Sequence, residues 1–140
     1  GLTRIGNDYV RRSDSSMISL NNSWSVSGVN DINNDGKADI ILSNKLDGSL
    51  HIYLMDGLTR TGNDYLRQAD ASIVRLGSSW HVVNVNDMNG DGKTDILLSN
   101  KTDGSMQIFL MDGLTQLGND YVRRSDSSSI QLSSQWQITE

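Results

Sequence analysis

Two short stretches of the sequence concentrate carboxylates at a regular spacing. Residues 31–39 read DINNDGKAD and residues 87–95 read DMNGDGKTD, and both fit the pattern D-x-N-x-D-G-x-x-D. Side-chain oxygens at the first, third, fifth and ninth positions, with a backbone carbonyl at the seventh, suit a hard cation that takes roughly six to eight oxygen ligands, and calcium fits best. The predicted ligands of two calcium ions per chain are Asp31, Asn33, Asp35, the Lys37 carbonyl and Asp39, and then Asp87, Asn89, Asp91, the Lys93 carbonyl and Asp95.

The glycines and the charges of these loops agree with a metal site. Gly36 and Gly92 stand where the chain must turn sharply around the ion, in a conformation that a side chain would penalise. Three carboxylates in one loop repel one another until a divalent ion neutralises them. The simpler interpretation is a pair of Asp/Asn/Gly turns, because these residue types favour turns for local reasons. Two matches at one spacing favour the metal site.

An EF-hand is the competing interpretation, and two features of the sequence argue against it. The twelfth position needs a bidentate glutamate, but Leu42 and Leu98 stand there. The residues that follow each loop are β-prone, where an EF-hand needs a helix. We therefore expect each loop to join two strands.

The loops belong to a tandem repeat. Trp24, Trp80 and Trp136 recur at a spacing of 56 residues, and so do the segments that begin Gly-Leu-Thr. We interpret the 140-residue chain as a single repeat domain that comprises repeat 1 (1–56), repeat 2 (57–112) and a partial repeat 3 (113–140).

Short apolar runs within a repeat predict β-strands. In the second repeat these runs are 80–85, 95–98 and 106–111, and the Asp103-Gly104 pair between the last two predicts a hairpin. We expect a fourth, outer strand at 73–76, preceded by a loop. Because the run 106–111 is apolar on both faces, both faces must be covered, as in a propeller blade. The predicted fold class is all-β, with β-propeller blades of four antiparallel strands and about 2.5 blades per chain.

The composition argues against several classes of function. A net charge of −5 and a pI near 4.8 disfavour nucleic acid as a partner. No apolar run is long enough for membrane insertion, and the chain has no cysteine. His51 and His81 are not repeated, and no Ser-His-Asp pattern is present, so we expect no enzyme.

The pattern W-x-V-x-x-x-N-D-x-N-x-D-G-K-x-D-I-x-L-S-N-K, followed by L-M-D-G, resembles the FG-GAP and VCBS repeat families. These families include the calcium-binding propeller blades of integrin α-subunits, of fungal lectins with the same fold and of bacterial secreted or surface proteins. The resemblance implies a calcium-stabilised propeller with the ligands named above, and a secreted or cell-surface location.

A further segment, G-N-D-Y-x-R, occurs three times and carries an aromatic ring, amide and carboxylate groups and a guanidinium. A lectin uses such groups to stack on sugars and to bind their hydroxyls. The alternative is a structural loop whose polar groups satisfy their own backbone. The candidate ligand-binding residues are Asn7, Asp8, Tyr9, Arg11, Asn63, Asp64, Tyr65, Arg67, Asn119, Asp120, Tyr121 and Arg123. For the three tryptophans, packing between blades is favoured over sugar stacking.

Two functional hypotheses follow. The first is a calcium-binding, lectin-like module that acts in carbohydrate binding or cell adhesion, with glycans or glycoproteins as partners. The second is a structural or engineered repeat scaffold in which calcium serves stability alone. Because two and a half blades cannot close a ring, we also expect a homo-oligomer in which other copies of the chain complete the propeller. The alternative is that the sequence is a fragment of a longer propeller.

Overall fold

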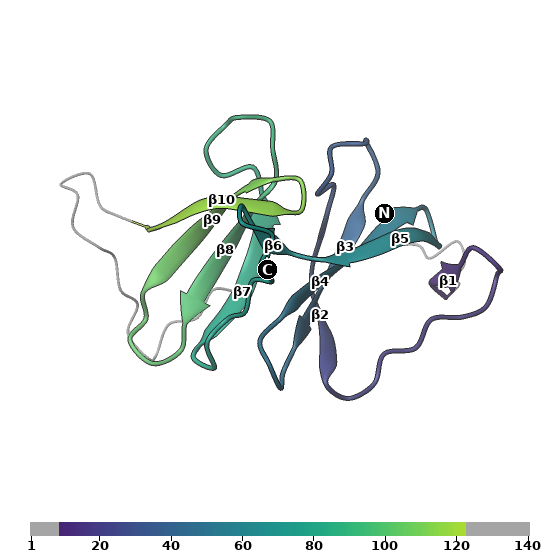
Figure 1. Cartoon of the computed structure of the whole chain (residues 1–140), viewed down its shortest axis with the longest axis horizontal. Helices are drawn as coiled ribbons and strands as arrows, with labels where there is room; N and C mark the ends of the chain where they lie inside the picture. Colours follow the sequence, from purple (N-terminus) through teal and green to yellow (C-terminus); the bar gives the residue numbers. More distant parts are fainter. Residues whose placement is uncertain (1–8, 123–140) are drawn as a thin grey trace, which may run out of the picture.

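A computed structural model describes residues 9–122, and this part of the chain folds into two β-sheets of five strands each (Figure 1). The described residues include no helix, and therefore none that is long and apolar enough to cross a membrane. The predicted all-β fold class is confirmed.

The two sheets repeat the same topology. The first has the strand order β1-β5-β4-β3-β2 and the second has the order β6-β10-β9-β8-β7. In each sheet four long strands form an antiparallel meander, and a two-residue strand pairs in parallel with its outer edge. The strands are β1 (Arg11–Arg12), β2 (Trp24–Asn30), β3 (Asp39–Asn44), β4 (Leu50–Asp56), β5 (Thr59–Tyr65), β6 (Arg67–Gln68), β7 (Trp80–Asn86), β8 (Asp95–Asn100), β9 (Met106–Asp112) and β10 (Thr115–Tyr121).

Three of the four long strands of the second sheet lie where the sequence predicted them, and so does the hairpin between β8 and β9. Gly104 at its tip has a φ of 73°, which glycine adopts without the penalty that a side chain would bring. The outer strand, by contrast, was predicted wrongly. It is β5 in the first sheet and β10 in the second, whereas residues 73–76 contribute only isolated bridges.

The error over the outer strand has a physical reason. Gly57, with a φ of 62°, reverses the chain directly after β4, so that β5 starts two residues later. Because β5 lies at the edge of the sheet, it is largely polar and gives no apolar run for a sequence reading to detect. The segment G-N-D-Y therefore belongs to this strand and is not a loop.

Residues 66–76 form a connecting segment that runs between the sheets and is hydrogen-bonded to both. Leu66 N donates to Leu50 O at 2.9 Å, and Leu76 N donates to Gly48 O at 2.8 Å, both in the first sheet. Arg67 N donates to Leu114 O at 3.0 Å in the second sheet. Because Leu66 is fully buried as well, the connecting segment joins the sheets through both backbone and core.

The hydrophobic core lies between the two sheets, whose inner strands β2 and β7 meet near the centre of the molecule (Figure 1). Val85 of β7 packs against Gly28 of β2, where any added Cβ would clash with it. Val82 and Val85 are only 9% and 4% exposed, whereas Val26 and Val29, their equivalents in the first sheet, are each 58% exposed. The two sheets thus stack with unlike faces in contact, as neighbouring propeller blades do.

Candidate metal centres

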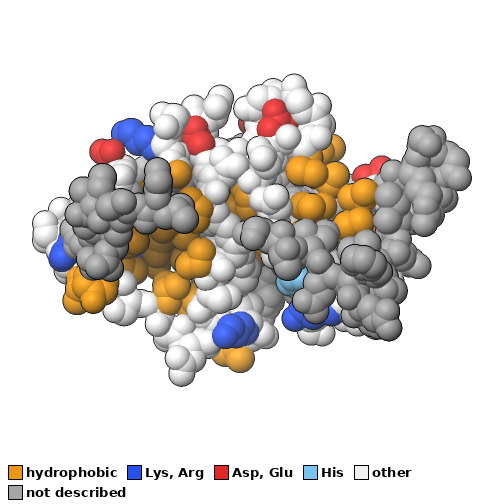
Figure 2. Space-filling model, turned by 180° about the vertical axis from the view of Figure 1, so that it is seen from behind, with side chains coloured by type: hydrophobic (Ala, Val, Ile, Leu, Met, Phe, Trp, Pro, Cys, Tyr) orange, Lys and Arg blue, Asp and Glu red, His pale blue; other side chains and the backbone are white. Residues whose placement is uncertain are grey.

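Each Asp-rich loop joins the first two long strands of its sheet, and both loops project from the same end of the molecule (Figure 1). Figure 2 shows acidic side chains at this end. In the first loop one carboxylate oxygen from each of Asp31, Asp35 and Asp39 lies within 4.8 Å of the other two. The second loop brings Asp87, Asp91 and Asp95 together in the same way, again with the oxygens within 4.8 Å. One cation could bridge such a set.

The first aspartate of each loop organises the turn around itself. Asp31 Oδ1 accepts a hydrogen bond from Asp35 N at 3.0 Å, and Asp31 Oδ2 accepts one from Gly36 N at 2.7 Å. Asp87 accepts the matching bond from Gly92 N at 2.8 Å. Gly36 and Gly92 have φ values of 84° and 82° in open space, so glycine is favoured there by its backbone conformation and not by crowding.

The last aspartate of each loop is fully buried and reaches the third long strand of its sheet. Asp39 Oδ2 accepts a hydrogen bond from Ile32 N at 3.1 Å, and Asp39 Oδ1 accepts one from Met55 N at 2.9 Å. Asp95 repeats this arrangement with Met88 N and Met111 N, each at 3.0 Å. A carboxylate has about four lone-pair sites, so oxygens with these bonds can still bind a cation. The sequence predicted these residues as ligands but not as links to β4 and β9.

The first carboxylate of the second loop is suited to binding a metal. The hydrogen bond from Gly92 N is the main reason why the pKa of Asp87 lies below its ordinary value, and burial opposes this effect. Asp87 is therefore ionised at neutral pH, as a metal ligand must be.

The lysine side chains point to partners outside the loops. Lys37 Nζ lies 3.6 Å from Asp56, and Lys93 Nζ lies 3.4 Å from Asp112. The ammonium groups are thus engaged elsewhere, and the backbone carbonyls are what these residues would offer to an ion. Asn33 is exposed in the first loop, and Asn89 Oδ1 accepts a hydrogen bond from Asp91 N at 3.3 Å. All the predicted ligand atoms are oxygens, which fits a hard cation.

The two loops also contact each other across the sheets. Thr94 Oγ1 in the second loop donates to Asp31 O in the first at 2.6 Å, and Asn30 Nδ2 donates to Val85 O at 2.7 Å. The sequence signalled neither bond. The residues that would hold the first ion are therefore connected to the neighbouring sheet.

In the second and third copies the G-N-D-Y residues lie on β5 and β10, apart from the Asp-rich loops, and Arg67 lies on β6. In the second copy Arg67 lies 3.3 Å from Asp64 and donates to Ala71 O at 3.1 Å, and the Tyr65 ring lies 4.5 Å from that of His51. These contacts within the chain favour the structural interpretation. Of the other candidates, Tyr9, Arg11, Asn63, Asn119, Asp120 and Tyr121 are described, whereas Asn7, Asp8 and Arg123 lie outside the described residues.

The tryptophans differ in their surroundings. Trp80 packs against the core between the sheets, whereas Trp24 contacts His51 at a ring distance of 5.8 Å on the outer face of the first sheet. Trp136 lies outside the described residues.

The family model described as an FG-GAP-like repeat matches residues 31–98, a span that begins at the first aspartate of the first loop and ends within β8, after the second loop. No curated protein and no solved structure matches the chain. Residues 31–98, with both Asp-rich loops, are therefore FG-GAP-like repeat sequence, the family that the motif resemblance predicted.

Proposed function

We propose that this chain is a calcium-binding propeller module in which each Asp-rich loop holds one Ca²⁺ ion. The observation that carries this proposal is the pair of carboxylate triads, each with its oxygens within 4.8 Å of one another. Where three such groups meet, their mutual repulsion is relieved by a divalent cation. The bound ion would supply that neutralisation and no chemistry beyond it.

The donor set favours calcium over other metals. Zinc and copper prefer imidazole and thiolate ligands, and these loops offer carboxylate, amide and carbonyl oxygens instead. Magnesium requires near-ideal octahedral geometry and keeps much of its water, whereas calcium accepts irregular sets of roughly six to eight oxygens at flexible distances. Because the ligands come from one short loop, their arrangement suits calcium, which tolerates irregular coordination geometry.

The position of the loops suggests a structural role for the ion. Asp39 is at once a predicted ligand and the partner of Met55 N in β4, and Asp31 O accepts the bond from Thr94 in the next sheet. An ion bound to these residues would hold a loop, a strand and the neighbouring sheet in one arrangement. Because it binds the folded state alone, it must raise the stability of that state.

Calorimetric titration of the metal-free protein with Ca²⁺ tests the proposal. We expect two ions to bind per chain. Variants Asp35→Asn and Asp91→Asn should each weaken one site while the other keeps its affinity. Calcium binding that neither substitution weakens, or no binding at all, would refute the assignment of these loops.

We further propose that the module is non-catalytic and recognises carbohydrate on the cell surface or outside the cell, as a lectin-like adhesion module. This proposal draws on the FG-GAP resemblance and on a cleft between the sheets that is lined by serine, lysine and histidine residues among others. A glycan array probed with the calcium-loaded protein tests it. The absence of binding to neutral, amino and acidic sugars would favour the scaffold hypothesis.

The outer face of the first sheet supports a proposal of self-association. Val26 and Val29 are each 58% exposed there, although the equivalent Val82 and Val85 are buried against the neighbouring sheet. We propose that a second copy covers this face with one of its own sheets. Light scattering should show an oligomer that Val29→Lys dissociates without unfolding the protein, and a monomeric parent protein would overturn the proposal.

A further inference from the structure

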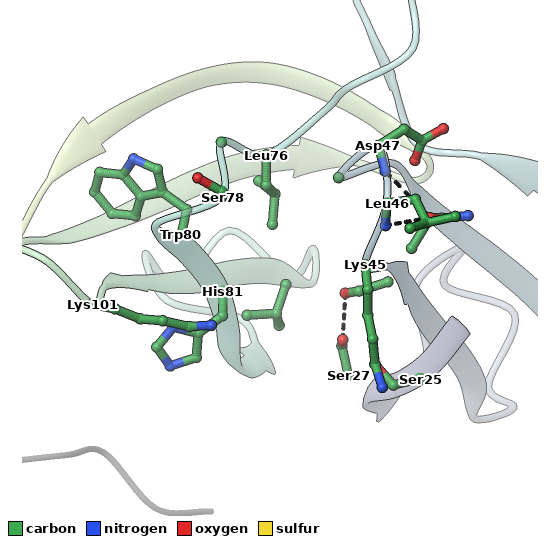
Figure 3. Close-up of a pocket in the computed structure, with 15 residues that line it drawn as sticks. Ser25, Ser27, Lys45, Leu46, Asp47, Leu76, Ser78, Trp80, His81 and Lys101 are labelled. Carbon is green, nitrogen blue, oxygen red and sulfur yellow. Dashed lines mark hydrogen bonds between the residues drawn. The ribbon is translucent and has the colours of Figure 1, made fainter. Parts of the chain in front are cut away.

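A cleft of about 430 Å³ opens between the two sheets (Figure 3). It is lined by residues at the starts of β2 and β7, whereas the Asp-rich loops follow the ends of these strands. One wall consists of Ser25, Ser27 and Ser43 from the first sheet, and the opposite wall consists of residues 80–82 from β7. Residues 76–78 of the connecting segment close one side. Pockets of about 300–1,000 Å³ are typical of small-molecule sites. The cleft exists only where two repeats meet.

Two lysines make this cleft positively charged. Lys45 and Lys101 occupy equivalent positions in the two β-hairpins, and both line the cleft. In Figure 3 Lys45 runs along the wall beside Ser25 and Ser27, and Lys101 extends from the opposite side. The other two lysines of the chain pair with Asp56 and Asp112, whereas neither Lys45 nor Lys101 forms an ion pair within residues 9–122.

The one carboxylate of the cleft already has partners. Asp47 accepts hydrogen bonds from the Ser49 hydroxyl at 2.7 Å and from Ser49 N at 2.9 Å, and it lies 3.9 Å from Arg75. Asp47 keeps its negative charge, so the cleft holds two ammonium groups against one carboxylate, and positive charge remains in excess there although the chain as a whole carries a net charge of −5. A local excess of positive charge in an acidic protein attracts an anionic ligand.

The remaining groups of the cleft suit a polyhydroxylated ligand. The hydroxyls of Ser27 and Ser43 are hydrogen-bonded to each other and can each make a further bond. Leu76 points into the cleft and offers an apolar surface on which the C–H face of a sugar ring can lie (Figure 3).

We propose that this cleft binds an acidic sugar, whose carboxylate lies between Lys45 and Lys101 and whose hydroxyls meet the serines of the opposite wall. This inference rests on the proposed recognition of carbohydrate and names its site and the class of its ligand. It does not involve the Asp-rich loops. A long polyanion fits less well, because the net charge of the chain would repel it outside the cleft.

The test is a titration of the full, calcium-loaded chain with galacturonate, galactose and inorganic phosphate, followed by heteronuclear NMR. Galacturonate should bind at least about tenfold more tightly than galactose, a preference of about 1.4 kcal/mol. Because the lysines are exposed, the difference should shrink as salt rises. Phosphate that binds as tightly as galacturonate would mark a simple anion site and overturn the assignment to a sugar.

Substitutions then locate the site. Lys45→Gln and Lys101→Gln should each weaken galacturonate binding several-fold, whereas Arg60→Gln is a charge-matched control, because its guanidinium packs 4.9 Å from the centre of the Tyr53 ring on another part of the surface. Lys45 and Lys101 are exposed and Arg60 is half-buried, and none of the three belongs to the hydrophobic core, so the fold should stay intact. Galacturonate binding that survives both lysine substitutions would overturn the proposal.

The glycan array separates failure of this site from failure of the general function. Binding of neutral glycans that Lys45→Gln and Lys101→Gln leave unchanged would overturn the cleft but retain carbohydrate recognition. Silence toward every glycan, with galacturonate also unbound by NMR, would overturn both proposals.

Discussion

Replacing Asp95 by asparagine separates the two roles that the structure gives this residue. Its side chain is fully buried, and its two oxygens accept bonds from Met88 N and Met111 N, each at 3.0 Å. Asparagine has one oxygen, so its amide group must face one of these N–H donors. The substitution therefore loses one bond to a charged acceptor and leaves a buried donor without a partner. We expect a loss of about 2–3 kcal/mol without any metal.

Asp91→Asn is the matched control, because Asp91 is exposed and its Oδ1 accepts a bond from Lys93 N at 2.9 Å, which asparagine can keep. In chelator this variant should unfold at or slightly above the temperature of the parent protein, because it removes one of three repelling carboxylates, as Asp95→Asn also does. For a domain of this size a loss of about 1 kcal/mol lowers the unfolding temperature by roughly 4 °C. In chelator Asp95→Asn should therefore unfold about 8–12 °C below the Asp91→Asn control.

Calcium adds the second comparison. At a free concentration of 100 times the dissociation constant, a site that binds only the folded state contributes about 2.7 kcal/mol. Both variants should lose most of this increment at the second loop, while the first loop keeps its own. Thermal unfolding followed by circular dichroism, with calcium and with chelator, measures both effects. If Asp95→Asn equalled Asp91→Asn in chelator, the structural role of Asp95 would be refuted. A parent protein insensitive to calcium would refute the metal sites.

Two further predictions concern the fold. The hydrogen bond from the Ser105 hydroxyl is the main reason why the pKa of Asp103 lies below its ordinary value of 3.8. The ionised Asp103 therefore stabilises the fold fully above pH 3.8, and this stabilisation is lost as the pH falls through the lower pKa of the folded state. In urea unfolding between about pH 5 and 2, the free energy of unfolding of Asp103→Asn should fall less steeply than that of the parent protein. Gly28→Ala should destabilise the stacked sheets by about 1–3 kcal/mol, because its Cβ would clash with Val85. Gly118→Ala, with nothing within 4 Å of the added Cβ, is the control, and equal unfolding temperatures for the two variants would contradict the observed stacking.

Local patterns predicted much of the fold. The strands that end at Asn86, Asn100 and Asp112 were recognisable because each is an apolar run closed by a turn. The outer strands were not, because an edge strand needs few apolar side chains and its pairing depends on a partner. The prediction of a strand at 73–76, within the connecting segment, was wrong for a related reason. The apolar residues of this segment, Leu66 and Val74, are buried between two sheets, and no periodicity within the segment reports that environment.

The candidate ligands were likewise readable from the sequence, because each site is built within nine consecutive residues whose types and spacing are local properties. The bonds that fix these loops in place were not readable. Asp39 bonds to Met55, 16 residues away, and Thr94 bonds to Asp31, 63 residues away. The same limit applies to the cleft, since Lys45 and Lys101 come from different repeats and face one space only after the sheets stack.

The sequence by itself determined the repeat, the FG-GAP-like motif and the oxygen-rich loops, since each depends on residues close together along the chain. The tertiary structure alone decided which strand forms the edge, which faces are buried and where a cleft opens. These features depend on burial and hydrogen bonding between distant segments, whose free energies are gained only when the two sheets pack together.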